Sequence, residues 1–484
     1  MWKQRGIGIG AVSVADIIKA QKYFRRIKRI MQVSAYEAMK GKIRAAEMFH
    51  GKHFSNEVKN TAAVILKNTV SVLESIEGNF GGNSAVGNMN PVGSYKNFII
   101  KVASLAIPAL DVFDWVHVEA MGTANSQILF TRYIRLSNKG KSKQGDIISD
   151  PFGVYYRKDA DGNRENAIDG DYVGENTFDE ITVPTGGIAA GGEVALRWTP
   201  VREVVSVTKN GTALTKDTDY KFADGKLTLV AAAAANDKLV VMYKWDNKYL
   251  PSEDIPTIGT KVEAIPLVAK PHKLRIVFDA LDNLIYKNDY QIDISKELPK
   301  KAIEDFMFSI ATKVSDEIIK NAPTSADLMP YSLSAPDGWI AQHYAAFGSV
   351  LNAAQAAITK VTNIYAGNRA FIGTRLVPVV MATPGFKAAD VEGKIGTQLI
   401  GSIGNLKIYH KPDMDSYTYV VFAKGQGAEL SVGVLGIYLA ALPASIIPTQ
   451  LLEYADGMNV QGFYSLYDYV HLNSMLSVKG TVTH

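Results

Sequence analysis

The sequence predicts an α+β protein, with segregated helices and mixed sheet, into which a small all-β domain is inserted. Two long helical patterns occupy residues 299–321 and 341–365. Several short strand patterns separated by hairpin signals occupy residues 174–247. Strand patterns dominate the remainder of the chain from residue 370 onward, and its 484 residues are enough for roughly two to four domains.

The composition is that of an ordinary globular protein. The hydrophobic fraction is 47% and the charged fraction 21%, which excludes disorder as a description of the whole chain. The formal net charge of +4 is small for this length and indicates no strong nucleic-acid or membrane field. The chain has no cysteine, which excludes disulfides, cysteine-rich zinc sites and thiol nucleophiles and fits a reducing cytoplasm.

One charge-free segment, residues 430–452, is long enough to be considered as a membrane span. Gly433, Gly436, Pro443 and Pro448 interrupt it, so a continuous apolar helix is disfavoured there. We expect two buried strands joined by a turn, and no membrane span.

The N-terminal region, residues 11–76, has apolar residues at helical spacing. Its first helix is basic, and the cations lie close together: Lys19, Lys22, Arg25, Arg26, Lys28 and Arg29. Such a helix can contact DNA, an anionic membrane or an acidic segment, or it can simply present a solvated face. Residues 78–93 are rich in Gly and Asn and indicate a flexible joint or extended arm.

The inserted domain follows a strand pattern at 127–136 and a polar surface excursion at 137–180. Two dipeptides, Asn210-Gly211 and Asp224-Gly225, are strong hairpin signals, because both positions of such a turn need positive φ. Short strands at this spacing predict an immunoglobulin-like sandwich. The expected strands are 195–198, 204–208, 220–222, 226–230 and 238–245.

After the insert, strands are expected at 261–265 and 273–278. The helix 299–321 begins with Pro299 in its first turn and ends before Pro323. Its core stripe consists of Ile303, Phe306, Ile310, Val314 and Ile318. The second helix, 341–365, has Gly367 as a stop, and strands are expected at 370–380, 406–410 and 417–422.

The motifs that would carry chemistry are absent or incomplete. Gly140-Lys141-Ser142 ends like a phosphate-binding loop, but Arg135 occupies the place of the first glycine. A calcium-loop pattern begins at Asp159 but has Arg164 at the required glycine. We therefore expect no catalytic, cofactor-binding or metal-binding residues and no enzyme activity.

The order of several segments resembles the Hong Kong 97-type fold of tailed-phage capsid proteins, and most of all the T-even phage group of major capsid proteins. The similar segments are 106–114 (AIPALDVFD), 121–136, 262–284, 294–298, the helix 299–321, 438–442 and 462–469. The resemblance covers about 97–484 without the insert, whereas the first 95 residues depart from the pattern.

The resemblance implies a layout of N-terminal arm, extended loop, peripheral domain with a long spine helix, and axial domain. The ranges expected are 1–96 for the helical region and arm, 97–150 for the start of the peripheral domain and the ascending extended loop, 151–247 for the inserted sandwich, 248–322 for the descending loop and spine helix, 323–445 for the axial domain and 446–484 for the closing peripheral strands.

The function implied is a major capsid protein that forms hexamers and pentamers of the icosahedral head shell, assembled in the bacterial cytoplasm and found in the virion. Implied partners are further copies, portal, scaffold and decoration proteins, and packaged double-stranded DNA. We expect the basic N-terminal helix to face inward, toward scaffold or packaged DNA, and to make contacts without sequence specificity. Two alternatives stay open. One is an encapsulin-like compartment shell; the other is a carbohydrate- or cell-surface-binding protein whose sandwich stacks sugars on Trp198, Tyr220, Tyr243 and Trp245.

Overall fold

The structure is a computed structural model, and two compact units make up the chain. Unit 1 comprises residues 1–129 and 264–484, and unit 2 comprises residues 130–263. The residues that the structure describes are 34–48, most of 53–70, 112–120, 125–150, 153–158, 164–170, 172–246, 255–292, 294–334, 340–363, 366–389, 396–424, 437–441, 449–453, 458–471 and 474–483.

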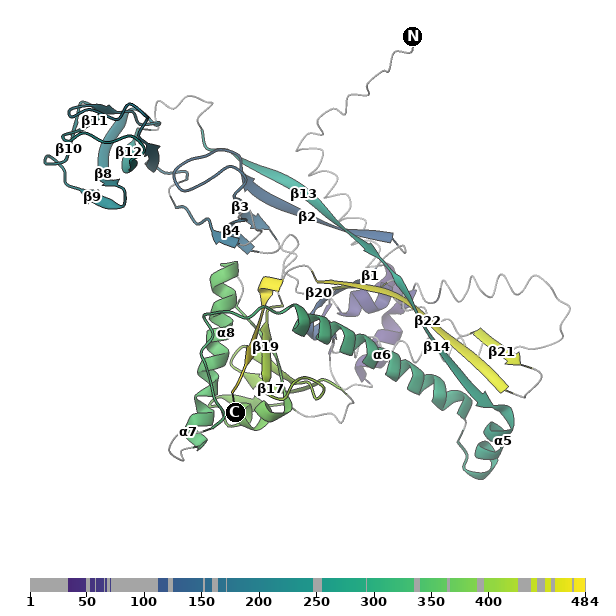
Figure 1. Ribbon diagram of the computed structural model, residues 1–484. Helices are drawn as coiled ribbons and strands as arrows, with labels where there is room; N and C mark the ends of the chain where they lie inside the picture. Colours follow the sequence, from purple (N-terminus) through teal and green to yellow (C-terminus); the bar gives the residue numbers. More distant parts are fainter. Residues whose placement is uncertain are drawn as a thin grey trace, which may run out of the picture. The chain divides into compact units, whose positions relative to one another are not determined.

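Unit 2 contains a two-sheet β-sandwich (Figure 1). The four-stranded sheet has the order β6 (Asn176–Thr182), β12 (Lys238–Trp245), β8 (Val201–Lys209), β9 (Thr212–Leu214). The three-stranded sheet has the order β10 (Tyr220–Ala223), β11 (Lys226–Leu229), β7 (Glu193–Val194). Buried side chains of both sheets form one core. The predicted strands 204–208, 220–222, 226–230 and 238–245 correspond to β8, β10, β11 and β12, whereas β6, β7 and β9 were not predicted. The immunoglobulin-like class of the sandwich stays a prediction.

Both predicted hairpins are present. Asn210 and Gly211 have φ of 49° and 82° and connect β8 to β9, and Asp224 and Gly225 have φ of 51° and 76° and connect β10 to β11. The predicted strand 195–198 is wrong. The amides of Arg197 and Trp198 donate to the side chains of Asp179 and Tyr243 instead of to a neighbouring strand.

A third sheet, of five strands, contains the two long strands that flank the insert in sequence. Its order is β13 (Ile258–Val268), β2 (Asn125–Arg135), β3 (Ile147–Asp150), β4 (Gly153–Lys158), β5 (Arg164–Asn166). β2 and β13 have 11 residues each and neighbour one another although the whole sandwich separates them in sequence.

Unit 1 contains a sheet in which N-terminal and C-terminal strands meet. Its order is β1 (His117–Ala120), β20 (Ile437–Ala441), β22 (Met458–His471), β14 (Lys270–Asp279), and β21 (Thr449–Glu453) also pairs with β22. The two strands predicted within 430–452 are present as β20 and β21, but each pairs with β22 and not with the other. Their predicted burial and connecting turn lie outside the described residues. None of the helices in the described ranges is long and apolar enough to cross a membrane.

The long helix α6 (Ile294–Asn321) lies along β14 and β22 (Figure 1). The prediction that this helix begins at Pro299 is wrong, because it begins five residues earlier. Ser295, Lys296, Glu297 and Leu298 already form the first turn, and Pro299 removes only the hydrogen bond its amide would have donated to Ser295. Ahead of α6, α5 (Ala280–Asp289) follows directly on β14.

The six-stranded sheet of unit 1 has the order β16 (Phe386–Ala388), β17 (Gln398–Ile403), β18 (Leu406–His410), β15 (Arg369–Ile372), β19 (Thr418–Phe422), β23 (Ser477–Thr481). The predicted strand 370–380 is only partly right, since it ends at Ile372 and is followed by α9 (Val377–Met381). Pro378 lies in the first turn of α9, where its missing amide proton is not needed.

The predicted helix 341–365 is divided into α7 (Ile340–Ala345) and α8 (Phe347–Thr362). The amide of Ala346 is shared between the carbonyls of Gln342 and His343, at 3.1 Å each, which tightens the turn at the break. α8 ends before Gly367, because Asn363 adopts the left-handed conformation with φ of 59°. The apolar side chains of Phe347, Leu351, Ala354 and Ile358 are buried on one side of α8.

Candidate functional site

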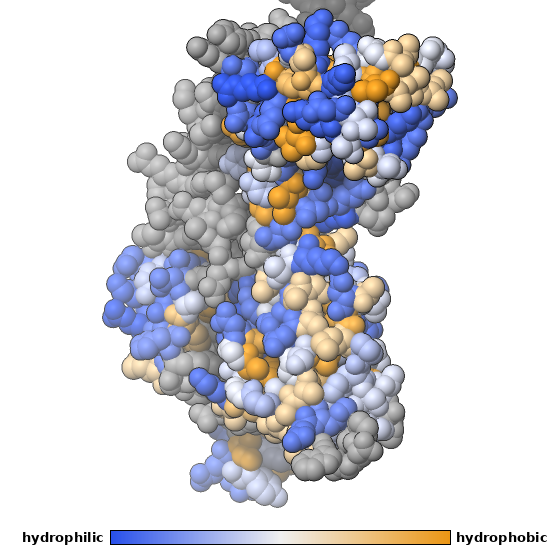
Figure 2. Space-filling model, turned by 90° about the vertical axis from the view of Figure 1, so that its left-hand side faces the viewer, coloured by the Kyte–Doolittle hydropathy of each residue, from blue (hydrophilic) through white to orange (hydrophobic). Residues whose placement is uncertain are grey.

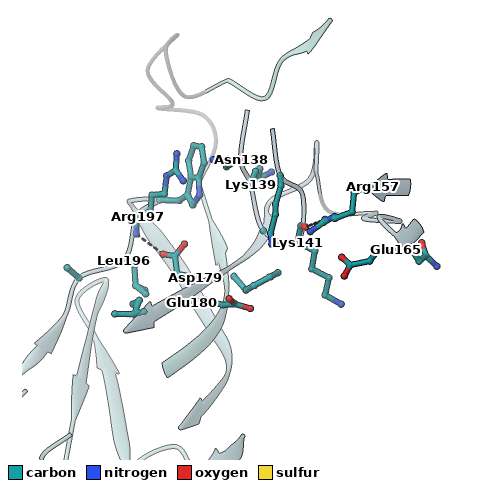
Figure 3. A pocket seen from close by; sticks show the side chains of 16 residues that line it. Asn138, Lys139, Lys141, Arg157, Glu165, Asp179, Glu180, Leu196 and Arg197 are labelled. Carbon is teal, nitrogen blue, oxygen red and sulfur yellow. Dashed lines mark hydrogen bonds between the residues drawn. The ribbon is translucent and has the colours of Figure 1, made fainter. Parts of the chain in front are cut away.

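Unit 2 contains a cavity of about 660 Å³ between the sandwich and the five-stranded sheet of β13, β2, β3, β4 and β5. Charged side chains of both signs line it, among them Lys139, Lys141, Arg157, Arg197, Glu165, Asp179 and Glu180. Figure 3 shows Lys141, Arg157 and Glu165 on one side and Asp179, Leu196 and Arg197 on the other.

The charges nearest this cavity are used by the protein itself. Arg157 donates to the carbonyl of Lys141 at 2.6 Å and to the Asp146 carboxylate at 2.9 Å. The Asp179 carboxylate accepts from the Tyr243 hydroxyl at 2.8 Å and from the Arg197 amide at 2.7 Å. A cleft whose positive and negative side chains are hydrogen-bonded to other groups of the protein is typical of a structural feature. It favours neither an anion nor a cation as a ligand.

Below the cavity, Arg135 is buried and holds the loops of unit 2 together. Its guanidinium donates to Ser142 Oγ at 2.6 Å and to the Ala167 carbonyl at 3.1 Å, and it lies 4.6 Å from the Tyr172 ring centre. Ser142 Oγ donates in turn to the Asp169 carboxylate at 2.6 Å. The sequence Gly140-Lys141-Ser142 is therefore a tight turn whose hydroxyl serves this network, in agreement with the rejection of a phosphate loop.

A second buried cluster in unit 2 joins the strands of the five-stranded sheet that contains β2 and β13. The Tyr156 hydroxyl donates to Asp150 at 2.5 Å, and Arg132 donates to Asp150 at 3.0 Å and to Glu263 at 2.9 Å. Arg164 stacks 3.9 Å from the centre of the Tyr156 ring. Burial, reinforced by the Asp150 charge, raises the pKa of Tyr156, so its hydroxyl remains a donor at any physiological pH. These contacts hold neighbouring strands of the sheet together.

Unit 1 has a charged cluster around Asp114 of α4 (Val112–Trp115). Its carboxylate accepts from Lys407 Nζ at 2.8 and 2.9 Å and from the Tyr409 hydroxyl, and Arg369 lies 3.4 Å away. Burial acts to raise the pKa of Asp114, but the hydrogen bonds from Lys407 and Tyr409 and the nearby positive charges outweigh it, so the pKa lies below its ordinary value. The cluster ties α4 to β15 and β18.

A buried lysine makes a second link in unit 1. Lys411 is 1% exposed, yet its Nζ lies 3.0 Å from Asp316 of α6 and 2.8 Å from Asp413. Both carboxylates are more than half exposed, whereas the lysine side chain, including its ammonium group, is buried, so the two carboxylates neutralise a buried charge. This ion pair joins α6 to the end of β18.

The sequence-predicted residues have different outcomes. Ile310, Val314 and Ile318 of the core stripe are buried, as predicted, and the side chains of Ile303 and Phe306 lie outside the described residues. The basic residues Lys19, Lys22, Arg25, Arg26, Lys28 and Arg29 also lie outside the described residues, so their inward position stays a prediction. The described residues hold no group of three or more His, Asp or Glu that could bind a metal ion.

The aromatic residues weighed for sugar stacking are part of the sandwich core. Trp198, Tyr220, Tyr243 and Trp245 are each at most 4% exposed, and the Trp198 and Trp245 rings lie 5.3 Å apart. Figure 2 shows a face on which hydrophobic residues are scattered among hydrophilic ones. The four aromatic side chains thus offer no stacking platform on the surface.

The residues missed at the sequence level are those of the Asp114 and Lys411 clusters and an apolar group on α5. The charged clusters join residues far apart in the chain, so no local motif marks them. The α5 group had a visible signal, because Leu281, Leu284 and Ile285 follow helical spacing between a strand and the long helix.

No protein-family model and no curated protein matches the sequence. Similar solved structures include one described as Microbacterium phage Oxtober96, at 12% identity over 49% of this chain and 80% of that chain, with a TM-score of 0.33. The mature capsid of bacteriophage PhiM1 is 10% identical over 49% and 78%, with a TM-score of 0.31. The SrpI encapsulin from Synechococcus elongatus PCC 7942 is 9% identical over 46% and 78%, with a TM-score of 0.29. Values this low define neither family nor function, so the proposed function rests on features of this chain.

Proposed function

We propose that this chain is the major capsid protein of a tailed bacteriophage, which assembles into the hexamers and pentamers of an icosahedral head shell around double-stranded DNA. The observation that carries the proposal is the order of elements in unit 1. β20 and β22, near the C-terminus, return to complete the sheet begun by β1 and β14, and α6 lies along that sheet. This arrangement supports the proposal, because the sequence resemblance implies a peripheral domain that is completed by strands near the C-terminus.

Two further features support the proposal. β2 and β13, each 11 residues long, neighbour one another on either side of the insert, as the two strands of an extended loop would. The segments between α6 and β20 form an α/β layer with a buried core, as an axial domain would, and β23 joins them, although the expected layout placed residues 446–484 with the peripheral strands. Within the class of capsid proteins, the assignment to the T-even group rests on the sequence segments alone.

The test is assembly of the purified full chain, followed by gel filtration and negative-stain electron microscopy at two salt concentrations. Closed shells, or rings of five or six subunits, are expected. A monomer that persists at high concentration and under crowding, with or without added scaffold protein, would contradict the proposal. Shells that enclose an enzyme and exclude DNA would favour the encapsulin-like alternative.

A further inference from the structure

Helix α5 has its apolar residues on the outside. Six large apolar side chains within twelve residues are between 44% and 66% exposed: Leu281, Leu284, Ile285, Tyr286, Tyr290 and Ile292. Asn283, in contrast, is the half-buried position of the helix. The helix is well formed, since the Asp279 carboxylate caps it by accepting from the Leu281 amide at 2.8 Å. A capped helix with this arrangement is the reverse of the usual surface helix, which buries its apolar face.

The size of this patch indicates an interaction surface. An aromatic side chain has a surface of about 150–250 Å². Half-exposed, the six side chains of the patch together present on the order of 500 Å² of surface. Patches of roughly 300–600 Å² are the largest found on typical monomers and are often functional. A helix of ten residues is also marginal on its own, so a partner that covers its apolar face would stabilise it.

We propose that the α5 patch is a contact between subunits, covered by a second copy of this chain in the assembled shell. This inference rests on the proposed function. The area argues for this occupant, because about 800 Å² per partner is usual for a stable isolated pair and the patch supplies less. A contact that is too small to hold a dimer, but is repeated by symmetry around a closed shell, contributes without trapping subunits as pairs.

The charges around the patch are compatible with such a contact. Asp282 and Asp289 carry negative charge and Lys287 carries positive charge, and all three are exposed. A surface with both signs around an apolar centre can match a copy of the same chain with opposite charges facing. A partner that recognised one sign only would be expected to face a patch of uniform charge.

The absence of native cysteine makes a direct test available. A single thiol is introduced by Leu284→Cys in the full chain, with Thr218→Cys, at an exposed position of the sandwich, as the matched control. The rate of maleimide labelling is measured on subunits and on assembled particles. We expect the thiol at 284 to be labelled at least tenfold more slowly in particles than in subunits, and the thiol at 218 to be labelled at similar rates in both.

The occupant is identified with a benzophenone maleimide attached at the same thiol in a mixture of ¹⁵N-labelled and unlabelled subunits. Photocrosslinks between the two isotopic forms support the proposal. Crosslinks confined to one isotopic form, together with protection already present in subunits, would mean that a segment of the same chain covers α5 and would overturn it.

The remaining outcomes separate this inference from the proposed function. Particles that form normally but label at 284 as fast as subunits overturn the inference and leave the shell function standing. A chain that never forms particles and labels at the same rate at every concentration overturns both. As a second variant, Leu284→Ser with Ile285→Ser should raise the subunit concentration needed for assembly at least tenfold while leaving the circular dichroism of the subunit unchanged.

Discussion

Replacing Asp114 by Asn tests the charged cluster that ties α4 to the six-stranded sheet. The substitution keeps the shape of the side chain but removes the charge that Lys407 and Arg369 face. The bond from Arg369 Nε to the backbone carbonyl of residue 114, at 2.7 Å, is retained. The variant therefore isolates the carboxylate from the packing of α4.

The expected loss follows from the contacts. Hydrogen bonds to charged groups contribute about 1.5–3 kcal/mol each, but the Asp114 side chain is 37% exposed and solvent screening reduces this. We expect the free energy of unfolding to fall by about 1–2 kcal/mol. Asp327→Asn is the matched control and should cost at most about 0.5 kcal/mol, because among the described residues the Asp327 carboxylate forms its ion pair with the exposed Lys360, at 2.7 Å.

The effect depends on pH in a defined direction. The pKa of Asp114 in the folded protein lies below its ordinary value of 3.8, so its contribution is complete above that value and is lost as the pH falls through the folded pKa. Because Asn does not titrate, the difference between wild type and Asp114→Asn should shrink below about pH 4. Urea unfolding of unassembled subunits, followed by tryptophan fluorescence, measures it. A loss no greater than that of Asp327→Asn, or a difference unchanged down to about pH 3, would refute the reasoning.

Four further predictions concern stability. Ile318→Ala, in the buried stripe of α6, should lower the unfolding free energy by about 2–5 kcal/mol in urea titrations; a loss under about 1 kcal/mol would contradict its place in the core. Gly211→Ala, at φ of 82°, should cost about 1–2 kcal/mol and speed amide exchange in the β8–β9 hairpin, and unchanged exchange would count against the turn. Tyr243→Phe removes the hydroxyl that donates to Asp179 and should cost about 1–3 kcal/mol by thermal unfolding, whereas an unchanged midpoint would show the bond to be dispensable. Excision of residues 176–245 with a short Gly-Ser linker should leave unit 1 folded, because the Trp245 amide donates to the Glu175 carbonyl at 3.0 Å and the two ends are adjacent; loss of the unit 1 unfolding transition would argue against this.

Local patterns in the sequence account for much of the fold. The dipeptides Asn210-Gly211 and Asp224-Gly225 predicted both hairpins, because the positive φ they permit is a property of the residues themselves. The buried stripe of α6 could also be predicted, because its apolar residues recur at helical spacing in the sequence. The predicted strand beyond Ile372 was an avoidable error, since Pro378 lacks the amide proton that a sheet requires.

The remaining features depend on contacts between distant residues. The amides of Arg197 and Trp198 bond to side chains 18 and 45 residues away, so strand propensity alone could not place them. Asp114 meets its partners across 255 to 295 residues of sequence, and only the folded topology brings them together. The sequence shows that α5 has an apolar side. That this side is exposed could not be predicted, because the neighbouring elements determine which side of the helix is covered.

The position of β22 in unit 1 has a consequence for the timing of synthesis. β14 ends at Asp279 and its partner strand begins at Met458, roughly 180 residues later, which corresponds to about 10–35 s of translation at the usual rates. β20 and β21 also wait for β22. The sheet beside α6 therefore cannot form until β22 has been synthesised, so a nascent chain that ends before Met458 lacks the strand that joins β14, β20 and β21.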